Sequence, residues 1–403
     1  MPKARRKTSA KPRPIRRKPS LDFSVTGLVY CTMMMFIGLA AINTQANLLF
    51  GVFGLMIGIL FISFLISGMV IVRLKVERVL PDHAMVGRPT AISYQITNRK
   101  RFWPSLSVTV SEYDGLEAFH RQPSAYMLHC ANRSTAIIPA EVIPRQRGVF
   151  EFDHFQLSTS FPFGFIKRAI NRGQKDSLVI LPAIGTMRRE LMQRFRSAES
   201  EGHNVRPSRG GMDEFYGLRE YRPGENPRRI YWKRSARTGT LALCEMTRVS
   251  PPKLIVVVDT CASDQSREMH IAVERAIAIA ATVIDNVIDA GLLVGLVAWS
   301  GQYIAVQPNI GKRHRLELLS HLARLERSPA IGANDLLEYA RPMFRSDTTA
   351  VLVSPADVSV GLGDAARGSL VALSSREDLY RRYFGFPDEI DFAAAYVQRE
   401  PLR

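Results

Sequence analysis

The sequence predicts a multi-domain protein with a two-helix transmembrane hairpin, a small antiparallel β-sandwich-like domain and a C-terminal α/β domain built on a doubly wound sheet. Three patterns predict this order. Two uncharged apolar runs lie near the start, apolar and polar residues alternate in the region that follows, and aliphatic runs alternate with helical patterns towards the end. We expect a tail at 1–20, the hairpin at 21–72, the β-rich domain at 73–182, a connector at 183–253 and the α/β domain at 254–403.

The composition is that of a mostly globular protein with a surplus of basic residues. Of 403 residues, 46% are hydrophobic and 23% are charged, which excludes a disulfide-stapled miniprotein and wholesale disorder. Lys and Arg number 54 against 37 Asp and Glu, so the formal charge of +17 favours an anionic partner. The four cysteines form no C-x-x-C pair, which indicates a reducing compartment rather than a zinc ribbon or a disulfide framework.

The first 20 residues hold much of this surplus. They contain several prolines and no acidic residue, so we expect a disordered tail that is attracted to anionic lipid headgroups. Binding to nucleic acid is the less favoured alternative, since the tail has no aromatic residue. The basic residues are Lys3, Arg5, Arg6, Lys7, Lys11, Arg13, Arg16, Arg17 and Lys18.

The two apolar runs, at about 25–42 and 48–72, are predicted to be transmembrane helices. At the helical rise they span roughly 27 and 37 Å, against a hydrocarbon core of about 30 Å. A signal peptide followed by a buried helix is the alternative, but no cleavage site of small residues is evident. The link at 43–47 is uncharged, whereas the tail precedes the first helix and Arg73, Lys75 and Arg78 follow the second. The positive-inside rule therefore predicts a two-pass protein of the cytoplasmic (inner) membrane with both termini and most of the chain in the cytoplasm.

The region at 73–182 shows the period of two that is typical of strands. Ile92, Tyr94 and Ile96 alternate with polar residues, and similar alternation follows near 106–110 and 150–152. Several short strands of this kind predict a small antiparallel sandwich. The single histidines in this region are expected to be structural rather than metal ligands.

From residue 254 the pattern changes to buried strands and helices. A continuous aliphatic run at 254–258 ends at Asp259, a helical pattern covers 268–290, and a second aliphatic run covers 292–299. Further helices are expected at 316–325 and 335–344, with strands at 350–353 and 370–373. Ligands of such folds gather at the carboxyl ends of the strands, where Asp259 lies.

The connector contains the most unusual segment, residues 217–239. Asn226 is a good N-cap, Pro227 suits the first helical position and Gly239 is a C-cap candidate, so the sequence predicts a short helix over 227–237. Arginine, lysine and large aromatic residues crowd this segment, which favours an anion-binding or partner-docking surface. A connector whose arginines pair with a neighbouring domain, with Trp232 in the core, is an equally good interpretation. The candidate docking residues are Arg219, Tyr221, Arg222, Arg228, Arg229, Trp232, Lys233 and Arg237.

This segment closely resembles the signature of a prokaryotic family known as domain of unknown function fifty-eight (DUF58). Glu225 stands where Asp is more usual, and the resemblance extends to the apolar hairpin, to Arg147-Gly148 and to residues 162–164. It implies a C-terminal domain similar to von Willebrand factor A domains. It also implies a membrane-anchored partner of a MoxR-type AAA+ ATPase that assembles or activates other protein complexes, with a client that the resemblance does not name. The residues that match the signature are Gly217, Arg219, Tyr221, Gly224, Arg228, Ile230, Trp232, Ala236, Arg237, Gly239 and Leu241.

The same resemblance raises the question of a metal. Von Willebrand A domains can hold Mg²⁺ through a D-x-S-x-S loop, a Thr and a later Asp. Here the loop retains only Asp259 and Ser263, with Cys261 in place of the first serine, a poor ligand for a hard cation. Ala333 and Pro355 stand near the places of the Thr and the later Asp. A degenerate site without functional Mg²⁺ is therefore expected.

Motifs of catalysis are not evident in the sequence. Phosphate loops, H-E-x-x-H and G-x-S-x-G are all lacking, and no carboxylate pair is convincing. The sequence therefore predicts a non-catalytic membrane-anchored adaptor without a cofactor. The alternative is a metal-dependent hydrolase at the cytoplasmic face of the membrane.

Overall fold

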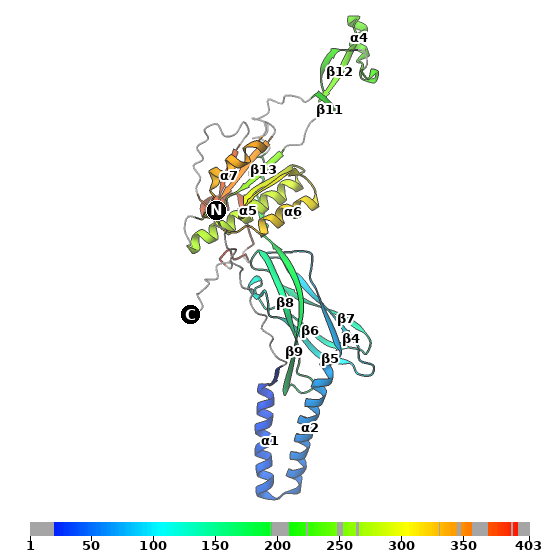
Figure 1. Cartoon of the computed structure of the whole chain (residues 1–403), viewed down its shortest axis with the longest axis vertical. Helices are drawn as coiled ribbons and strands as arrows, with labels where there is room; N and C mark the ends of the chain where they lie inside the picture. Colours follow the sequence, from blue (N-terminus) through cyan, green and yellow to red (C-terminus); the bar gives the residue numbers. More distant parts are fainter. Residues whose placement is uncertain are drawn as a thin grey trace, which may run out of the picture. The chain divides into compact units, whose positions relative to one another are not determined.

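A computed structural model shows how these segments fold (Figure 1). It describes residues 20–193, 195, 209–222, 225–247, 253–262, 266–329, 331–344, 348–356, 370–387 and 390–393. The chain divides into two compact units, Met1–Ile180 and Leu181–Arg403. The predicted basic tail lies outside the described residues except for Ser20.

Two long apolar helices lie near the start of the described chain, as predicted, after the short strand β1 (Ser20–Phe23). Helix α1 spans Val25–Thr44 and helix α2 spans Asn47–Ile71, which makes them 20 and 25 residues long. Ser24 caps α1 by accepting a hydrogen bond from the Gly27 N–H at 3.1 Å. Both helices expose most of their apolar side chains, and both are long enough to cross a bilayer.

The rest of the first unit consists of two antiparallel sheets. One sheet has the order β2 (Leu74–Val79), β4 (Thr90–Asn98) and β7 (Thr135–Val142). The other has the order β1 (Ser20–Phe23), β9 (Ile166–Leu181), β8 (Gly148–Thr159), β5 (Ser105–Glu112) and β6 (Ser124–Cys130), and β3 (Ala84–Met85) also pairs with β9. A 3-10 turn, η1, covers Leu116–Ala118.

The predicted alternation decides which side chains fill the core of this unit. Ile92, Tyr94 and Ile96 on β4 are all fully buried. The rings of Tyr94 and of Phe155 on β8 lie 6.0 Å apart, so side chains of the two sheets meet in one core. An antiparallel β domain therefore follows the helices, as the period of two predicted.

The second unit contains a five-stranded sheet. Its order is β15 (Tyr303–Asn309), β14 (Leu293–Trp299), β13 (Lys253–Val258), β16 (Thr348–Ser354) and β17 (Leu370–Ser374). Strands β14, β13, β16 and β17 are parallel, whereas β15 is antiparallel to β14. The antiparallel edge strand was not predicted; it forms because a tight turn at Gly301 (φ 71°) folds the chain back on β14.

Helices cover both faces of this sheet. Helix α7 (Ala333–Ala340) packs Leu336 and Leu337 against Ile255 and Val257 of β13. Helix α5 (Arg267–Asp289), which packs against α6 (Lys312–Ala323), covers the opposite face. The mixed α/β character predicted for this region is therefore present.

Smaller elements complete the second unit. Strand β10 (Thr186–Met187) pairs with β18 (Phe384–Gly385), which follows α8 (Glu377–Tyr383), and η3 covers Arg341–Met343. Strands β11 (Arg209–Glu220) and β12 (Ala242–Thr247) form a separate antiparallel ribbon. Between them lie η2 (Pro227–Arg229) and α4 (Trp232–Thr238).

Candidate partner-docking site

The unusual basic segment forms the end of the β11–β12 ribbon (Figure 1). We call the described residues between Tyr221 and Leu241 the cationic tip. The Tyr221 N–H donates to the Leu241 carbonyl at 2.8 Å, and the Tyr231 N–H donates to the Ala242 carbonyl at the same distance. The first bond joins the two ends of the cationic tip to each other, and the second joins its middle to β12.

Glu225 organises the first turn of the cationic tip. Its carboxylate pairs with the Arg219 guanidinium and accepts a hydrogen bond from the Arg222 N–H at 3.2 Å. The Tyr221 hydroxyl donates to the Glu225 carbonyl, also at 3.2 Å. The hydrogen bond from Arg219 is the largest of several contacts that lower the pKa of the Glu225 carboxyl. Arg219 and Tyr221, predicted as docking residues, thus make contacts within the tip itself.

The predicted helix over 227–237 is interrupted. Asn226 caps η2 by accepting a hydrogen bond from the Arg228 N–H at 3.1 Å, as predicted, but the chain then leaves helical geometry at Ile230. Ile230 is buried and bridges to Leu243 of β12, so contact with the ribbon breaks the helix. Helix α4 begins only at Trp232.

Helix α4 is fixed at both ends. The Ser235 hydroxyl donates to the Tyr231 carbonyl at 3.1 Å and accepts from the Ala242 N–H at 2.9 Å, which ties the helix to β12. Gly239 ends the helix with φ 73°, the left-handed C-cap that the sequence predicted. The helix therefore presents a defined outer surface.

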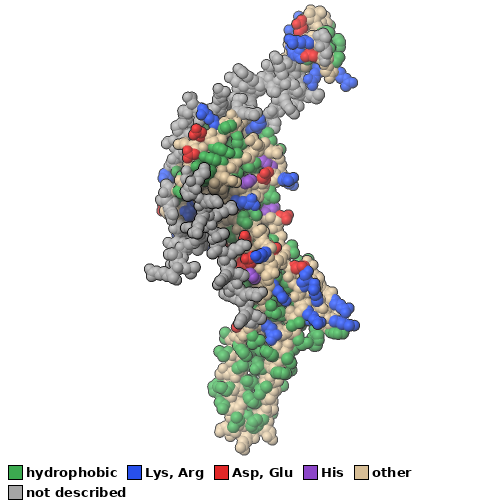
Figure 2. All heavy atoms as spheres, viewed as in Figure 1, with side chains coloured by type: hydrophobic (Ala, Val, Ile, Leu, Met, Phe, Trp, Pro, Cys, Tyr) green, Lys and Arg blue, Asp and Glu red, His purple; other side chains and the backbone are tan. Residues whose placement is uncertain are grey.

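That outer surface is cationic and aromatic. Trp232 is 64% exposed, so the interpretation that places it in a core is wrong for the part of the chain that the structure describes. Arg228, Lys233, Arg234 and Arg237 are also exposed, and among the described residues none of these four has an ion-pair partner. Figure 2 shows basic side chains on this ribbon. Arg222 is exposed and Arg229 is half-buried, so all eight predicted residues lie within or beside the cationic tip.

The candidate metal residue Asp259 lies at the carboxyl end of β13, as predicted, and is almost fully buried. One carboxylate oxygen accepts a hydrogen bond from the Cys261 N–H at 2.8 Å, and the other accepts from the Ser354 hydroxyl at 2.9 Å. Burial raises the pKa of Asp259, although both hydrogen bonds act in the opposite direction. Protein groups thus satisfy both oxygens.

The described residues around Asp259 do not fit Mg²⁺. Ser263 lies outside the described residues, and Cys261 offers only a thiol, whose pKa is raised by burial and by nearby carboxylates. Ala333 is the first residue of α7 and supplies no ligand atom from its side chain. Over the described ranges, no group of three or more His, Cys, Asp and Glu residues could hold a metal ion.

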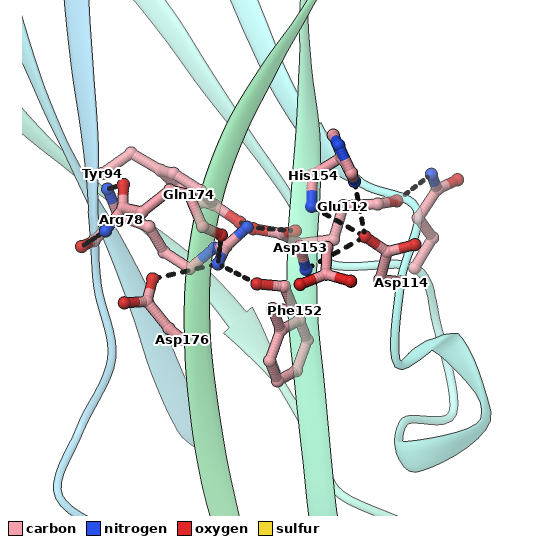
Figure 3. A network of polar contacts seen from close by, with 10 residues as sticks. Arg78, Tyr94, Glu112, Asp114, Phe152, Asp153, His154, Gln174 and Asp176 are labelled. Carbon is pink, nitrogen blue, oxygen red and sulfur yellow. Dashed lines mark hydrogen bonds and ion pairs between the residues drawn. The ribbon is translucent and has the colours of Figure 1, made fainter. Parts of the chain in front are cut away.

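A buried polar network in the first unit was not predicted. The Arg78 guanidinium on β2 donates to the two carboxylate oxygens of Glu112 at 2.7 and 3.1 Å, and to Asp176 at 3.0 Å (Figure 3). The Tyr94 hydroxyl also donates to Glu112, at 2.7 Å. Burial, and then the neighbouring Glu112, raise the pKa of Tyr94, which keeps its hydroxyl protonated. The network links the two sheets of the first unit.

The burial of Arg78 corrects one part of the predicted membrane topology. Arg78 was counted among the charges that mark the cytoplasmic side, but its side chain is fully buried and paired. The sequence contained a sign of this burial. Arg78 follows Leu74 and Val76 at a spacing of two, so its side chain points to the same side of β2. Glu112 follows Val108 and Val110 in the same way on β5. Opposite charges at inward positions of strands in the two sheets predict a buried pair.

The fold and the site define a chain with two apolar N-terminal helices, an antiparallel β domain and a mixed α/β unit that carries an exposed cationic tip. Residues 217–379 match the family model described as "Protein of unknown function DUF58". The match includes the cationic tip and all five strands of the large sheet of the second unit, and it agrees with the resemblance noted in the signature. No curated protein matches the chain.

Proposed function

We propose that the chain is a non-catalytic adaptor, anchored in the cytoplasmic membrane, that binds a MoxR-type AAA+ ATPase through the cationic tip. The proposal rests mainly on the exposure of Trp232 beside cations that have no ion-pair partner within the described ranges of the chain. Large exposed tryptophans flanked by arginines are the residues that most often dominate the energy of protein interfaces. The nearby carboxylate of Glu225 is already paired with Arg219, so the outer cations are left for an acidic partner.

The two apolar helices support the membrane anchor. Their length and composition suit a bilayer, and the uncharged link at 43–47 is the segment that would face the periplasm. The basic tail would add about 1 kcal/mol per basic residue near an anionic surface. Both termini, the β domain and the α/β unit would then lie in the cytoplasm.

The second unit supports a recognition role rather than catalysis. Parallel strands with helices on both faces suit a fold similar to von Willebrand factor A domains, and the Asp259 carboxylate is used in hydrogen bonds. A client protein would be recognised by this unit, while the ATPase supplies the energy for assembly or activation of the complex.

The test compares binding of the full-length chain, reconstituted in lipid nanodiscs, to the MoxR-type ATPase of the same organism. We expect Trp232→Ala to weaken binding by about 30-fold, the loss typical of a hot-spot tryptophan. Tyr126→Ala removes an exposed aromatic residue on strand β6 of the β domain and should leave binding unchanged.

A charge series tests the cations separately. We expect Arg228→Glu with Arg229→Glu to weaken binding about tenfold and to reduce its salt dependence. The same reversal at Arg16 and Arg17 of the tail is the matched control. Equal losses from the two reversals would overturn docking at the cationic tip.

A further inference from the structure

The β domain holds the last turn of helix α2 with a buried lysine. Lys100, in the loop between β4 and β5, donates from Nζ to the carbonyls of Met69 and Val70 at 2.9 and 2.8 Å. It also donates to the Ser105 hydroxyl at 2.7 Å, which in turn donates to the Val70 carbonyl at 3.0 Å. Carbonyls in the last turn of a helix lack partners within the helix. The loop at 99–104 is therefore fixed at the end of α2.

A second loop of the same domain holds the start of helix α1. The Ser24 N–H donates to the Phe165 carbonyl at 3.0 Å, and the Ser24 hydroxyl donates to the Gly164 carbonyl. Tyr30 stacks on Phe165 with ring centroids 4.2 Å apart. Gly27 permits this approach, since a Cβ there would lie 2.2 Å from the Phe165 carbonyl oxygen. Both helix ends are thus attached directly to the β domain, without a flexible linker.

Exposed aromatic residues lie in the loops and strand that meet the helix ends. Phe102 is 76% exposed and Trp103 is 57% exposed in the loop that holds α2. Phe163 is 50% exposed in the loop that holds α1, and Phe23, on the strand that leads into α1, is also exposed. Aromatic side chains at the level of helix ends are typical of a membrane–water interface.

Exposed arginines accompany these aromatic residues. The Arg99 N–H donates to the Arg73 carbonyl at 3.1 Å, and Asn132, next to Arg133, donates from its side chain to the Arg101 carbonyl at 3.0 Å. Neighbouring loops thus bring four exposed arginines together, at positions 73, 99, 101 and 133. No acidic residue occurs between Arg99 and Ser111. Figure 2 shows basic side chains gathered where the β domain meets the helices.

We propose that the loop at 99–103, with Arg73 and Arg133, is a peripheral membrane-binding surface that takes the phosphate headgroups of anionic phospholipids. The proposal rests on the proposed membrane anchoring, because α2 then places this loop at the lipid surface. The guanidinium groups bind phosphate, and Trp103 and Phe102 enter the interfacial layer beside α2. The β domain consequently lies against the bilayer.

Fluorescence of Trp103 tests this surface in the full-length chain. Trp232→Phe with Trp299→Phe leaves Trp103 as the single tryptophan, and nanodiscs of phosphatidylglycerol with brominated acyl chains supply a quencher in the membrane. We expect quenching to reduce Trp103 emission at least about twofold, as suits an interfacial aromatic residue. The matched control carries its single tryptophan in the same unit but at the opposite end of β5, through Tyr113→Trp with all three native tryptophans replaced by phenylalanine, and should not be quenched. Equal emission of Trp103 in brominated and plain lipid would overturn the proposal.

The headgroup is tested with a charge reversal. Arg99→Glu with Arg101→Glu should restore most of the Trp103 emission in brominated phosphatidylglycerol. The same reversal at Arg121 and Arg172, exposed residues of the β domain outside these loops, should not. Two outcomes would show that the anionic headgroup is not the ligand and would overturn the proposal. One is an equal effect of the Arg99/Arg101 and Arg121/Arg172 reversals on Trp103 emission. The other is equal quenching of Trp103 in brominated phosphatidylcholine and brominated phosphatidylglycerol.

Extraction with alkaline carbonate separates this proposal from the membrane anchoring on which it rests. We expect the chain to resist extraction in every variant, because α1 and α2 are unchanged. A chain that is extracted would overturn the anchoring and this surface together. A chain that stays in the membrane while Trp103 is not quenched would overturn this surface alone.

Discussion

At the scale of single residues, Asp259 gives the folded state an unusual dependence on pH. Its pKa is raised by burial, so the folded state holds the proton more tightly than the unfolded state. The raised pKa therefore adds to the free energy of unfolding, and this contribution is complete below the unfolded-state pKa of Asp259, about 3.9. It is lost as the pH rises through the pKa of Asp259 in the folded state. Asp259 opposes the usual gain in stability between acid and neutral pH.

Replacement of Asp259 by asparagine removes this dependence. Asp259→Asn keeps an oxygen that can accept from the Cys261 N–H, so we expect the variant to gain stability relative to the wild type as the pH rises from about 4. Urea denaturation followed by circular dichroism, at a series of pH values, measures the difference. Glu141→Gln, at an exposed position of β7, is the control and should change the pH dependence of stability less than Asp259→Asn does. If the difference in free energy of unfolding between Asp259→Asn and the wild type does not change with pH, the prediction is wrong.

The same residues show what sequence patterns can and cannot give. The place of Asp259 after a buried strand was predictable, because a continuous aliphatic run ends there. Its partner Ser354 was not, since the hydroxyl comes from β16, nearly a hundred positions later in the chain. Arg78 was misjudged because a basic residue after an apolar helix also fits the positive-inside rule, and only its partner on another strand decides between the two.

At the scale of elements, the cationic tip shows where local signals suffice. Asn226 and Gly239 cap their helices as predicted, since both depend on local backbone geometry. The break at Ile230 was not predictable, because it comes from contact with β12. The exposure of Trp232 likewise depends on the ribbon and could not be read from its own helix.

Gly239 allows a sharp test of how the tip is held. We expect Gly239→Ala to destabilise the end of α4 by about 1 kcal/mol, because alanine is strained at φ 73°. Hydrogen exchange of the Ser235 and Gly239 amides measures the loss of protection. Gly217→Ala on β11 is the matched control, since an added Cβ there meets nothing within 4 Å. Equal effects of the two substitutions would contradict a C-cap role for Gly239.

At the scale of the whole molecule, the sequence predicted the order of the parts well. Three patterns predicted this order: the long uncharged apolar runs, the alternation of apolar and polar residues, and the aliphatic runs. Each extends over many residues, so a few exceptional residues do not obscure it. The antiparallel strand β15 was missed because its alternation is short and includes Pro308. Proline is found at sheet edges, and β15 is an edge strand.

The orientation proposed for the chain in the membrane can be measured. With the four native cysteines replaced by serine, Gln45→Cys should react with a membrane-impermeant maleimide on cells whose outer membrane has been permeabilised, because the link at 43–47 is expected to face the periplasm. Asn132→Cys, on the β domain, should react only after the inner membrane is lysed. Labelling of Asn132→Cys before lysis would contradict the predicted topology.

The hydrogen bonds of Lys100 to the end of α2 determine how the proposed membrane anchor would act mechanically. A tether that ends in a flexible linker restricts only the distance of its cargo from the membrane, and the cargo can still rotate. Here a tilt of α2 must turn the β domain with it, because the loop at 99–104 and the helix end move as one body. A replacement of α1 and α2 by a lipid-modified flexible peptide would therefore preserve residence at the membrane while losing a fixed orientation.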